Sequence, residues 1–302
     1  MEIQALGGDL KMRNFWRPAL LVVMLTLVAG CAHDPGSTSA GAPLSKFQEI
    51  LQKNELVVGM TGKQPPLNAK DKEGQLIGLE PDLARRIAEA MGVKVKFELM
   101  DFFELFPALE SGRLDLIISG LTMTPERNLK MAFVGPYFVT GKSFLTKADH
   151  IAKCQELCDI DSPQTTLTFL KGSTSQSFAE KMIPKARTIP AKDYDEAVRL
   201  VLEGRADAMI ADFLACVLAV IRHPNRGLST SLRTFSFEPL GIALPGTDPL
   251  LINWMDNFLK ILQGTNELKK LSQYWMENER WIEEKFDPSV GFETSGQKST
   301  DL

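Results

Sequence analysis

Cysteine and histidine, the residues that typically bind zinc or form disulfides, are few in this chain. The 302 residues include four cysteines and three histidines. The histidines are scattered, and no cysteine–histidine group has the spacing of a zinc site. We therefore expect no metal site, and nothing in the sequence indicates a cofactor. Cys154 and Cys158 could form a local disulfide in an oxidising compartment or remain two thiols, and their spacing does not decide between the two.

Four other residues could help to bind an anion or a cation, through their side chains or their backbone amides. Ser173 and Thr174 begin a predicted helix, whose free amide N–H groups favour an anion. Arg127 carries a planar guanidinium that can meet a carboxylate with two hydrogen bonds, which lysine cannot do. Asp212 follows a predicted buried strand. Taken alone, Arg127 is better explained as a surface arginine of a helix, and Asp212 as a helix N-cap.

The composition is that of an ordinary globular protein. The chain is 44% hydrophobic and 24% charged, which excludes a collagenous, disordered or multi-span membrane protein. The net charge of −4 gives no reason to expect a nucleic-acid partner. The length allows roughly two domains.

Residues 12–31 (MRNFWRPALLVVMLTLVAGC) have the layout of a secretory signal peptide. A basic stretch is followed by an apolar run and then by small residues. The apolar run is shorter than the about 20 residues that a membrane-spanning helix needs. We expect residues 1–30 to be the signal peptide, which makes the protein extracytoplasmic.

The end of this segment, Val28-Ala29-Gly30-Cys31, resembles a bacterial lipobox. The resemblance implies that Cys31 is lipidated, becomes the new N-terminus and anchors the protein to a bacterial membrane. Stable anchoring requires two or more acyl chains. Residues 31–45 are partly Gly/Ser/Pro-rich, as a flexible tether should be. The alternative is a soluble secreted protein that is cut nearby.

From Leu44 onward, short apolar runs alternate with segments of helical periodicity, the order typical of an α/β protein. We expect strands over 56–60, 93–100, 114–119, 166–170, 208–211 and 240–244, and helices over 82–91, 103–110, 175–185, 194–203, 213–222, 249–262 and 266–276. Two phrases, LESGRLDLIISG and LEGRADAMIAD, repeat one plan and suggest two similar lobes. A ligand would then lie outside the carboxyl ends of the strands, facing the other lobe.

Several longer phrases closely resemble the amino-acid-binding proteins of ABC importers, solute-binding family 3. They are GLEPDLA (78–84), LFPALESGRLD (105–115), ISGLTMTPER (118–127), FVGPYF (133–138), KGST (171–174) and AMIAD (208–212). The resemblance runs from about residue 46 to residue 285, and the order and spacing of the phrases make it specific.

The resemblance implies how a ligand is held. Arg127 is expected to bind the α-carboxylate of an amino acid, and Asp212 its α-ammonium. The other residues expected to contribute polar groups around the carboxylate are Ser119, Gly120, Thr122, Ser173 and Thr174.

The wall around the ligand's side chain departs from the family pattern. Phe102 matches one aromatic or apolar position, but Gln64 stands where the family often has an aromatic residue, which weakens stacking on the ligand. Thr61 stands where some binders of basic amino acids carry aspartate, which counts against a cationic ligand. Other phrases resemble a subgroup that includes lysine binders. Trp275 and Trp281 are expected in the core of the first lobe.

The fold that the resemblance implies is the two-lobed periplasmic-binding-protein fold, type II-like, in which each lobe is a mixed sheet flanked by helices. We expect lobe 1 to comprise residues 46–140 and 236–285, and lobe 2 residues 141–235. A two-strand hinge is expected near 140–144 and 235–240, and a disordered tail over 286–302.

The implied function is to capture a small amino acid, as a monomer, and to deliver it to an ABC permease. The alternative is an enzyme on the same scaffold, similar to cyclohexadienyl or arogenate dehydratase. Such a reaction needs a positioned proton donor, and residues 213–222, just after Asp212, contain no carboxylate or histidine. This observation favours binding over catalysis.

Overall fold

The computed structural model describes residues 44–157 and 160–277. No helix in these two ranges is both long and apolar enough to cross a membrane. The predicted signal peptide, Cys31 and most of the tether, Cys158, Trp281 and the predicted tail lie outside the described residues.

The first of two five-stranded sheets has the strand order β5-β1-β6-β13-β7. Its strands are β1 (Glu55–Met60), β5 (Lys94–Leu99), β6 (Leu116–Ile117), β7 (Ala132–Thr140) and β13 (Glu238–Leu244). The sheet is mixed, because β1 runs parallel to β5 and β6 whereas β13 runs antiparallel to β6 and β7. A small antiparallel sheet follows β1 in the chain and consists of β2 (Lys63–Gln64), β3 (Asn68–Lys70) and β4 (Leu76–Ile77).

The second five-stranded sheet has the order β10-β9-β11-β8-β12. Its strands are β8 (Lys142–Thr146), β9 (Thr166–Leu170), β10 (Arg187–Ala191), β11 (Ala208–Asp212) and β12 (Ser229–Thr230). Strand β9 is parallel to β10 and β11, and β8 is antiparallel to β11 and β12. This sheet is therefore mixed as well.

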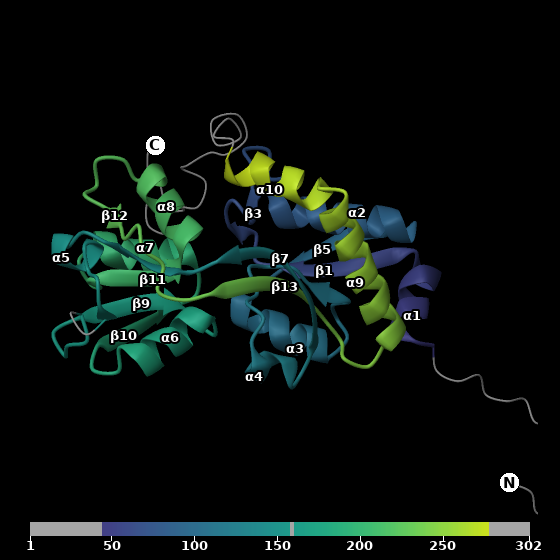
Figure 1. Ribbon diagram of the computed structural model, residues 1–302, viewed down its shortest axis with the longest axis horizontal. Helices are drawn as coiled ribbons and strands as arrows, with labels where there is room; N and C mark the ends of the chain where they lie inside the picture. The colour runs from purple at the N-terminus through teal and green to yellow at the C-terminus, as the bar shows by residue number, and fades with distance from the viewer. Residues whose placement is uncertain (1–43, 158–159, 278–302) are drawn as a thin grey trace, which may run out of the picture. The chain divides into compact units, whose positions relative to one another are not determined.

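The chain passes from the first sheet to the second after β7 and returns at β13. Only Gly141 separates β7 from β8, and β13 pairs with β7 from Glu238 opposite Thr140 onward. Figure 1 shows β7 and β13 side by side, with the strands of the second sheet to their left. Gly141 lies in one of the segments predicted for the hinge, 140–144, and β13 begins in the other, 235–240.

Helices flank both sheets, and most lie where the periodicity predicts them. They are α1 (Lys46–Lys53), α2 (Leu79–Met91), α3 (Leu105–Glu110), α4 (Pro125–Asn128), α5 (Asp149–Ala152), α6 (Thr174–Met182), α7 (Tyr194–Leu202), α8 (Phe213–Arg222), α9 (Pro249–Gly264) and α10 (Glu267–Met276). Helix α2 starts three residues earlier than predicted, directly after Gly78. A glycine is required there, because its φ is +129° and a Cβ atom would lie 2.2 Å from the Leu67 carbonyl oxygen.

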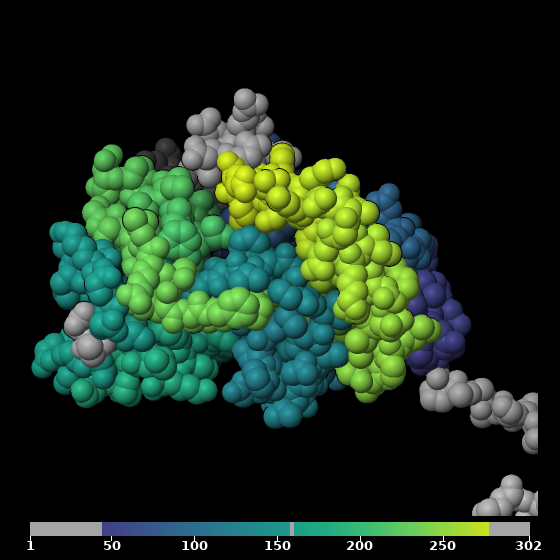
Figure 2. Space-filling view, in the orientation of Figure 1, coloured from purple at the N-terminus to yellow at the C-terminus, as the bar shows by residue number. Residues whose placement is uncertain are grey.

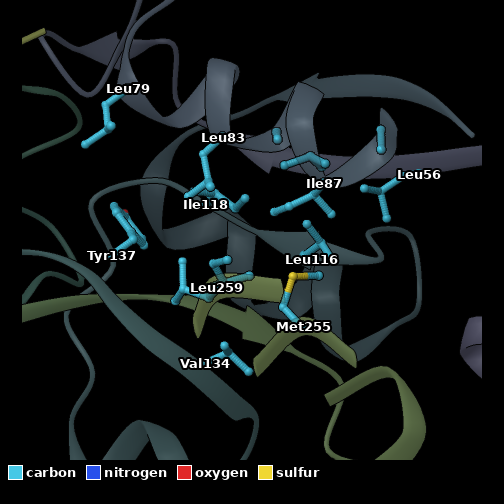
Figure 3. Packing of buried hydrophobic residues seen from close by; sticks show 14 of the residues in the cluster. Leu56, Leu79, Leu83, Ile87, Leu116, Ile118, Val134, Tyr137, Met255 and Leu259 are labelled. Carbon is cyan, nitrogen blue, oxygen red and sulfur yellow. The ribbon is translucent and has the colours of Figure 1, made fainter. Parts of the chain in front are cut away.

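The core of the first sheet lies between its strands and helices α2, α9 and α10. Leu83 and Ile87, one turn apart on α2, point into this core together with Met255 and Leu259 of α9 (Figure 3). Trp275 of α10 is 3% exposed and belongs to the same core, as predicted. In the space-filling view α9 and α10 form a continuous band over this part of the molecule (Figure 2).

Replacing Leu83 with alanine tests this core. Leu83 is fully buried, so we expect the substitution to lower the free energy of unfolding by about 2–5 kcal/mol. The measurement is urea unfolding followed by circular dichroism. Leu129, which is 88% exposed, supplies the control, because its replacement by alanine should change the free energy by less than about 0.5 kcal/mol. Equal effects at the two positions would contradict the packing described here.

Candidate functional site

Arg127 lies on the short helix α4, and its guanidinium is not a free surface group. Thr124 caps this helix by accepting a hydrogen bond from the Arg127 amide at 3.2 Å. The guanidinium donates through Nη1 to the carbonyl oxygen of Thr122 at 2.8 Å and through Nη2 to that of Gly172 at 3.2 Å. Because Gly172 follows β9 of the second sheet, Arg127 spans elements of both sheets. The interpretation as a surface arginine is therefore wrong.

Aromatic rings lie against the same guanidinium. Its central carbon is 5.8 Å from the ring centre of Phe102 and 5.2 Å from that of Phe106, within the range of a cation–π interaction. Burial lowers the pKa of Arg127 to about 10, although the carboxylates of Glu238 and Asp212 oppose this shift. The side chain is thus protonated at neutral pH and is held in a fixed orientation.

Asp212 is the last residue of β11 and occupies the N-cap position of α8, but its side chain caps no helix amide. Instead, Oδ1 accepts a hydrogen bond from Nζ of Lys142 at 2.6 Å. Among the described residues, none donates a hydrogen bond to Oδ2. Burial raises the pKa of Asp212, more than the Lys142 ammonium lowers it. Asp212 therefore occupies an N-cap position, but its carboxylate binds Lys142 and not the helix amides.

Lys142 and Glu238 complete a charged cluster that the sequence reasoning missed. Lys142 is the first residue of β8 and is 2% exposed, and its Nζ lies 3.3 Å from Oε2 of Glu238. Glu238 is the first residue of β13 and is 6% exposed. Each is a charged residue at the start of a largely buried strand, which is the signal that could have identified them. Their meeting requires both crossings between the sheets.

Glu238 also joins two of the predicted hydroxyl groups. Its Oε2 accepts hydrogen bonds from Oγ1 of Thr122 at 2.7 Å and Oγ1 of Thr174 at 2.9 Å. Burial raises the pKa of Glu238, but the Lys142 ammonium and the hydroxyl donors outweigh burial and hold this pKa below its usual value. Thr122 comes from the first sheet's side and Thr174 from the start of α6, so an ionised Glu238 links the two.

Three predicted residues are already engaged with the protein around them. Ser119 donates through Oγ to Oε1 of Gln64 at 3.1 Å and accepts from the amide of Thr61 at 3.0 Å. The Gly120 amide donates to Glu80. Ser173 caps α6 by accepting from the Ser175 amide, and its hydroxyl donates to the Leu170 carbonyl at 2.7 Å.

One small cavity brings most of these groups together. It is lined by Gln64, Phe102, Gly120, Thr122, Arg127, Lys142, Leu170, Ser173, Thr174, Tyr194 and Asp212. Every predicted ligand-binding residue except Ser119 is in this lining, and Lys142, Leu170 and Tyr194 are additions that the sequence reasoning did not identify. No group of metal-ligating side chains occurs among the residues that the structure describes. The cavity therefore presents a cation and an anion from opposite sheets, next to an aromatic wall.

Comparison with known proteins decides the family. The model of the bacterial extracellular solute-binding proteins, family 3, matches residues 56–278. The chain belongs to this family. Among curated family 3 relatives, the cyclohexadienyl dehydratase of Pseudomonas aeruginosa is 29% identical over 85% of this chain and 95% of its own. The L-cystine-binding protein TcyJ of Escherichia coli is 24% identical over 88% and 97%, and the glutamine-binding protein of Geobacillus stearothermophilus is 29% identical over 76% and 91%.

Solved structures of the family agree with the fold. The ancestral amino-acid-binding protein AncCDT-1, a precursor of cyclohexadienyl dehydratase, superposes with a TM-score of 0.71 at 34% identity over 76% of this chain and 99% of its own. A binding component of an ABC transporter from Wolinella succinogenes, complexed with lysine, gives 0.71 at 35% identity over the same shares. The predicted two-lobed family 3 fold with mixed sheets is confirmed.

Proposed function

We propose that this chain is an extracytoplasmic binding protein that captures an amino acid in the cavity described above and delivers it to an ABC permease. The observation that carries the proposal is the opposed pair of charges in one cavity, Arg127 from the first sheet's side and Asp212 from the second. The charges of a zwitterion are complementary to this pair, because a carboxylate can pair with the guanidinium and an ammonium with Oδ2 of Asp212. Relatives named for glutamine, arginine and cystine, and a neighbour complexed with lysine, support the amino-acid class.

The test is a thermal-shift screen of the protein amino acids on a protein that begins after Cys31. A ligand that binds only the native state stabilises it, by about 2.7 kcal/mol when its concentration is 100 times Kd. We expect one or a few amino acids to raise the melting temperature. A screen in which none does so would contradict the proposal.

We further propose that residues 46–140 and 236–285 form one lobe and residues 141–235 the other, and that the ligand stabilises the closed arrangement of the two. The strand order supports this division, since β13 returns to the first sheet. Contacts from one side to the other include Arg127 to Gly172 and the ion pair of Lys63 with Asp193 at 2.9 Å. The protein is proposed to work as a monomer.

We also propose that Cys31 carries a lipid that holds the protein at a bacterial membrane. Replacing Cys31 with serine should release the protein from the membrane fraction, because the lipid-accepting thiol is lost. Ligand affinity should stay unchanged, since the cavity residues are remote from Cys31 in the chain. Detergent partitioning of the full chain, with ligand titration as the control, checks this expectation. Unchanged partitioning would contradict the lipid anchor.

A second function, cyclohexadienyl dehydratase activity, is favoured by one observation, the relative from Pseudomonas aeruginosa. The reaction needs a proton donor at the substrate. Asp212 is the carboxyl group that lines the cavity within the described part of the chain, and its Oδ1 is already bonded to Lys142, although burial outweighs this bond and raises the pKa of Asp212. We expect no turnover of prephenate or arogenate. A measurable rate that Asp212→Asn abolishes would replace the binding proposal with the enzymatic one.

A further inference from the structure

Glu80, the second residue of α2, is a fully buried carboxylate whose partners all donate hydrogen bonds to it. Oε1 accepts from the Gly120 amide and from the Tyr137 hydroxyl, and Oε2 accepts from the Asn68 side-chain amide. In the described ranges no lysine or arginine forms an ion pair with Glu80. Burying a carboxylate without a cation costs free energy unless several donors satisfy it. We therefore asked what this carboxylate contributes to the site.

Two of the three donors of Glu80, Asn68 and Gly120, lead toward the cavity wall. Asn68, which donates to Glu80, also donates to Oε1 of Gln64 at 3.3 Å, and its Oδ1 accepts from the Gly62 amide at 2.7 Å. Gln64 and Gly120 both line the cavity. Glu80 therefore lies directly behind the part of the wall that these two residues form.

Gly120 belongs to the loop 119–122, which orients Arg127. Its φ of +57° lies in the left-handed region, and a Cβ atom at this position would lie 3.1 Å from Oε1 of Gln64. Two residues later, the Thr122 carbonyl accepts from Nη1 of Arg127, and the Thr122 hydroxyl donates to Glu238. A change in the position of Gly120 is thus transmitted to the acceptor that holds the guanidinium.

We propose that Glu80 is a positioning residue for ligand binding: its carboxylate fixes the Gly120 amide, and through the loop 119–122 it holds Arg127 in the orientation that receives the ligand's carboxylate. This proposal rests on the function proposed above. Tyr137 and Asn68 hold the carboxylate of Glu80 itself in place. Burial raises the pKa of Glu80 above its usual value, and the three donors reduce this rise.

The first test needs no ligand. In Glu80→Gln the charge is lost, and the new NH₂ group faces one of the three donors, so the bond to Gly120 weakens. We expect the amide resonance of Gly120 in the NMR spectrum to move upfield from its parent position. If Glu80→Gln does not fold, Tyr137→Phe is the second variant: it should move the resonance downfield, because the Gly120 amide then no longer shares Oε1 of Glu80 with the Tyr137 hydroxyl. Glu89→Gln, an exposed position on the same helix, is the matched control and should leave the resonance unmoved.

The second test measures affinity by calorimetry with the best ligand from the amino-acid screen. Glu80→Gln should weaken binding about tenfold, a cost of about 1.4 kcal/mol, whereas Glu89→Gln should not change it. The double variant Glu80→Gln/Arg127→Lys should show a smaller fold-loss of affinity than the product of the fold-losses of the two single variants, because both changes act on the same guanidinium. A purely structural role would give multiplicative losses.

The outcomes separate the two proposals. A Gly120 resonance that does not move in folded Glu80→Gln, an unchanged affinity, or multiplicative losses would each overturn the positioning role. A screen in which no amino acid binds the parent protein would overturn the proposed function, while the Gly120 resonance would still report whether Glu80 holds the loop.

Discussion

Replacing Arg127 with alanine is expected to weaken amino-acid binding about 30-fold to several thousandfold. Truncating one partner of an enclosed charge pair costs about 2–5 kcal/mol, and about 1.4 kcal/mol corresponds to a tenfold change in affinity. Arg127→Lys keeps the charge but loses the planar fork, and one ammonium cannot replace the bonds to Thr122 and Gly172 in their present directions. We expect a loss of roughly tenfold or more for lysine.

The measurement is isothermal titration with the best ligand from the screen, with circular dichroism to confirm folding. Arg205→Ala is the control, because the Arg205 side chain is 62% exposed and pairs only loosely with Glu203, at 3.5 Å. It should bind like the parent. If folded Arg127→Ala also binds like the parent, the carboxylate assignment is wrong, and the amino-acid proposal loses its main physical support.

The second large effect is expected at Asp212. Asp212→Asn removes the negative charge that faces the ligand's ammonium and leaves Lys142 with Glu238 as its remaining anionic partner at 3.3 Å. By the same range of energies, we expect affinity to fall by about 30-fold or more. Titration calorimetry measures this loss. Asp256→Asn is the matched control, because Asp256 pairs with Lys260 on the exposed face of α9, and it should not change affinity.

The pH dependence of binding gives an independent check on Asp212. Only the ionised carboxylate attracts an ammonium. The ligand therefore binds with full affinity above the pKa of Asp212, and its affinity falls as the pH drops through this pKa. Because burial raises this pKa in the ligand-free protein, the fall should begin at a higher pH than for an exposed aspartate. Arg127, whose pKa is about 10, stays protonated in this range, and the pKa of Glu238, the other carboxylate of the cluster, is lowered, not raised. Asp212→Asn should lack this acid limb, and an unchanged pH profile in the variant would contradict the assignment.

Local signals predicted much of the fold because they depend on residues close together in the chain. The strand 166–170 and the helix 213–222 have the bounds predicted for them, since an apolar run and a following Pro224 are both read locally. The strand predicted over 114–119 is reduced to Leu116–Ile117. Its ends are held by hydrogen bonds from other elements, such as Ser119 to Gln64, which no local pattern reveals.

The sequence by itself identified the family and, through the family phrases, predicted Arg127 and Asp212 as ligand-binding residues. It could not decide between an N-cap and a binding role for Asp212, because the position at the start of a helix is the same in both. Only the tertiary structure directs that carboxylate to Lys142. Lys142 and Glu238 meet because the chain crosses between the sheets twice, and Glu80 reaches Gly120 across 40 residues of sequence. Such buried charges depend on which distant strands become neighbours, and that information resides in the packing of the two sheets and not in any short stretch of residues.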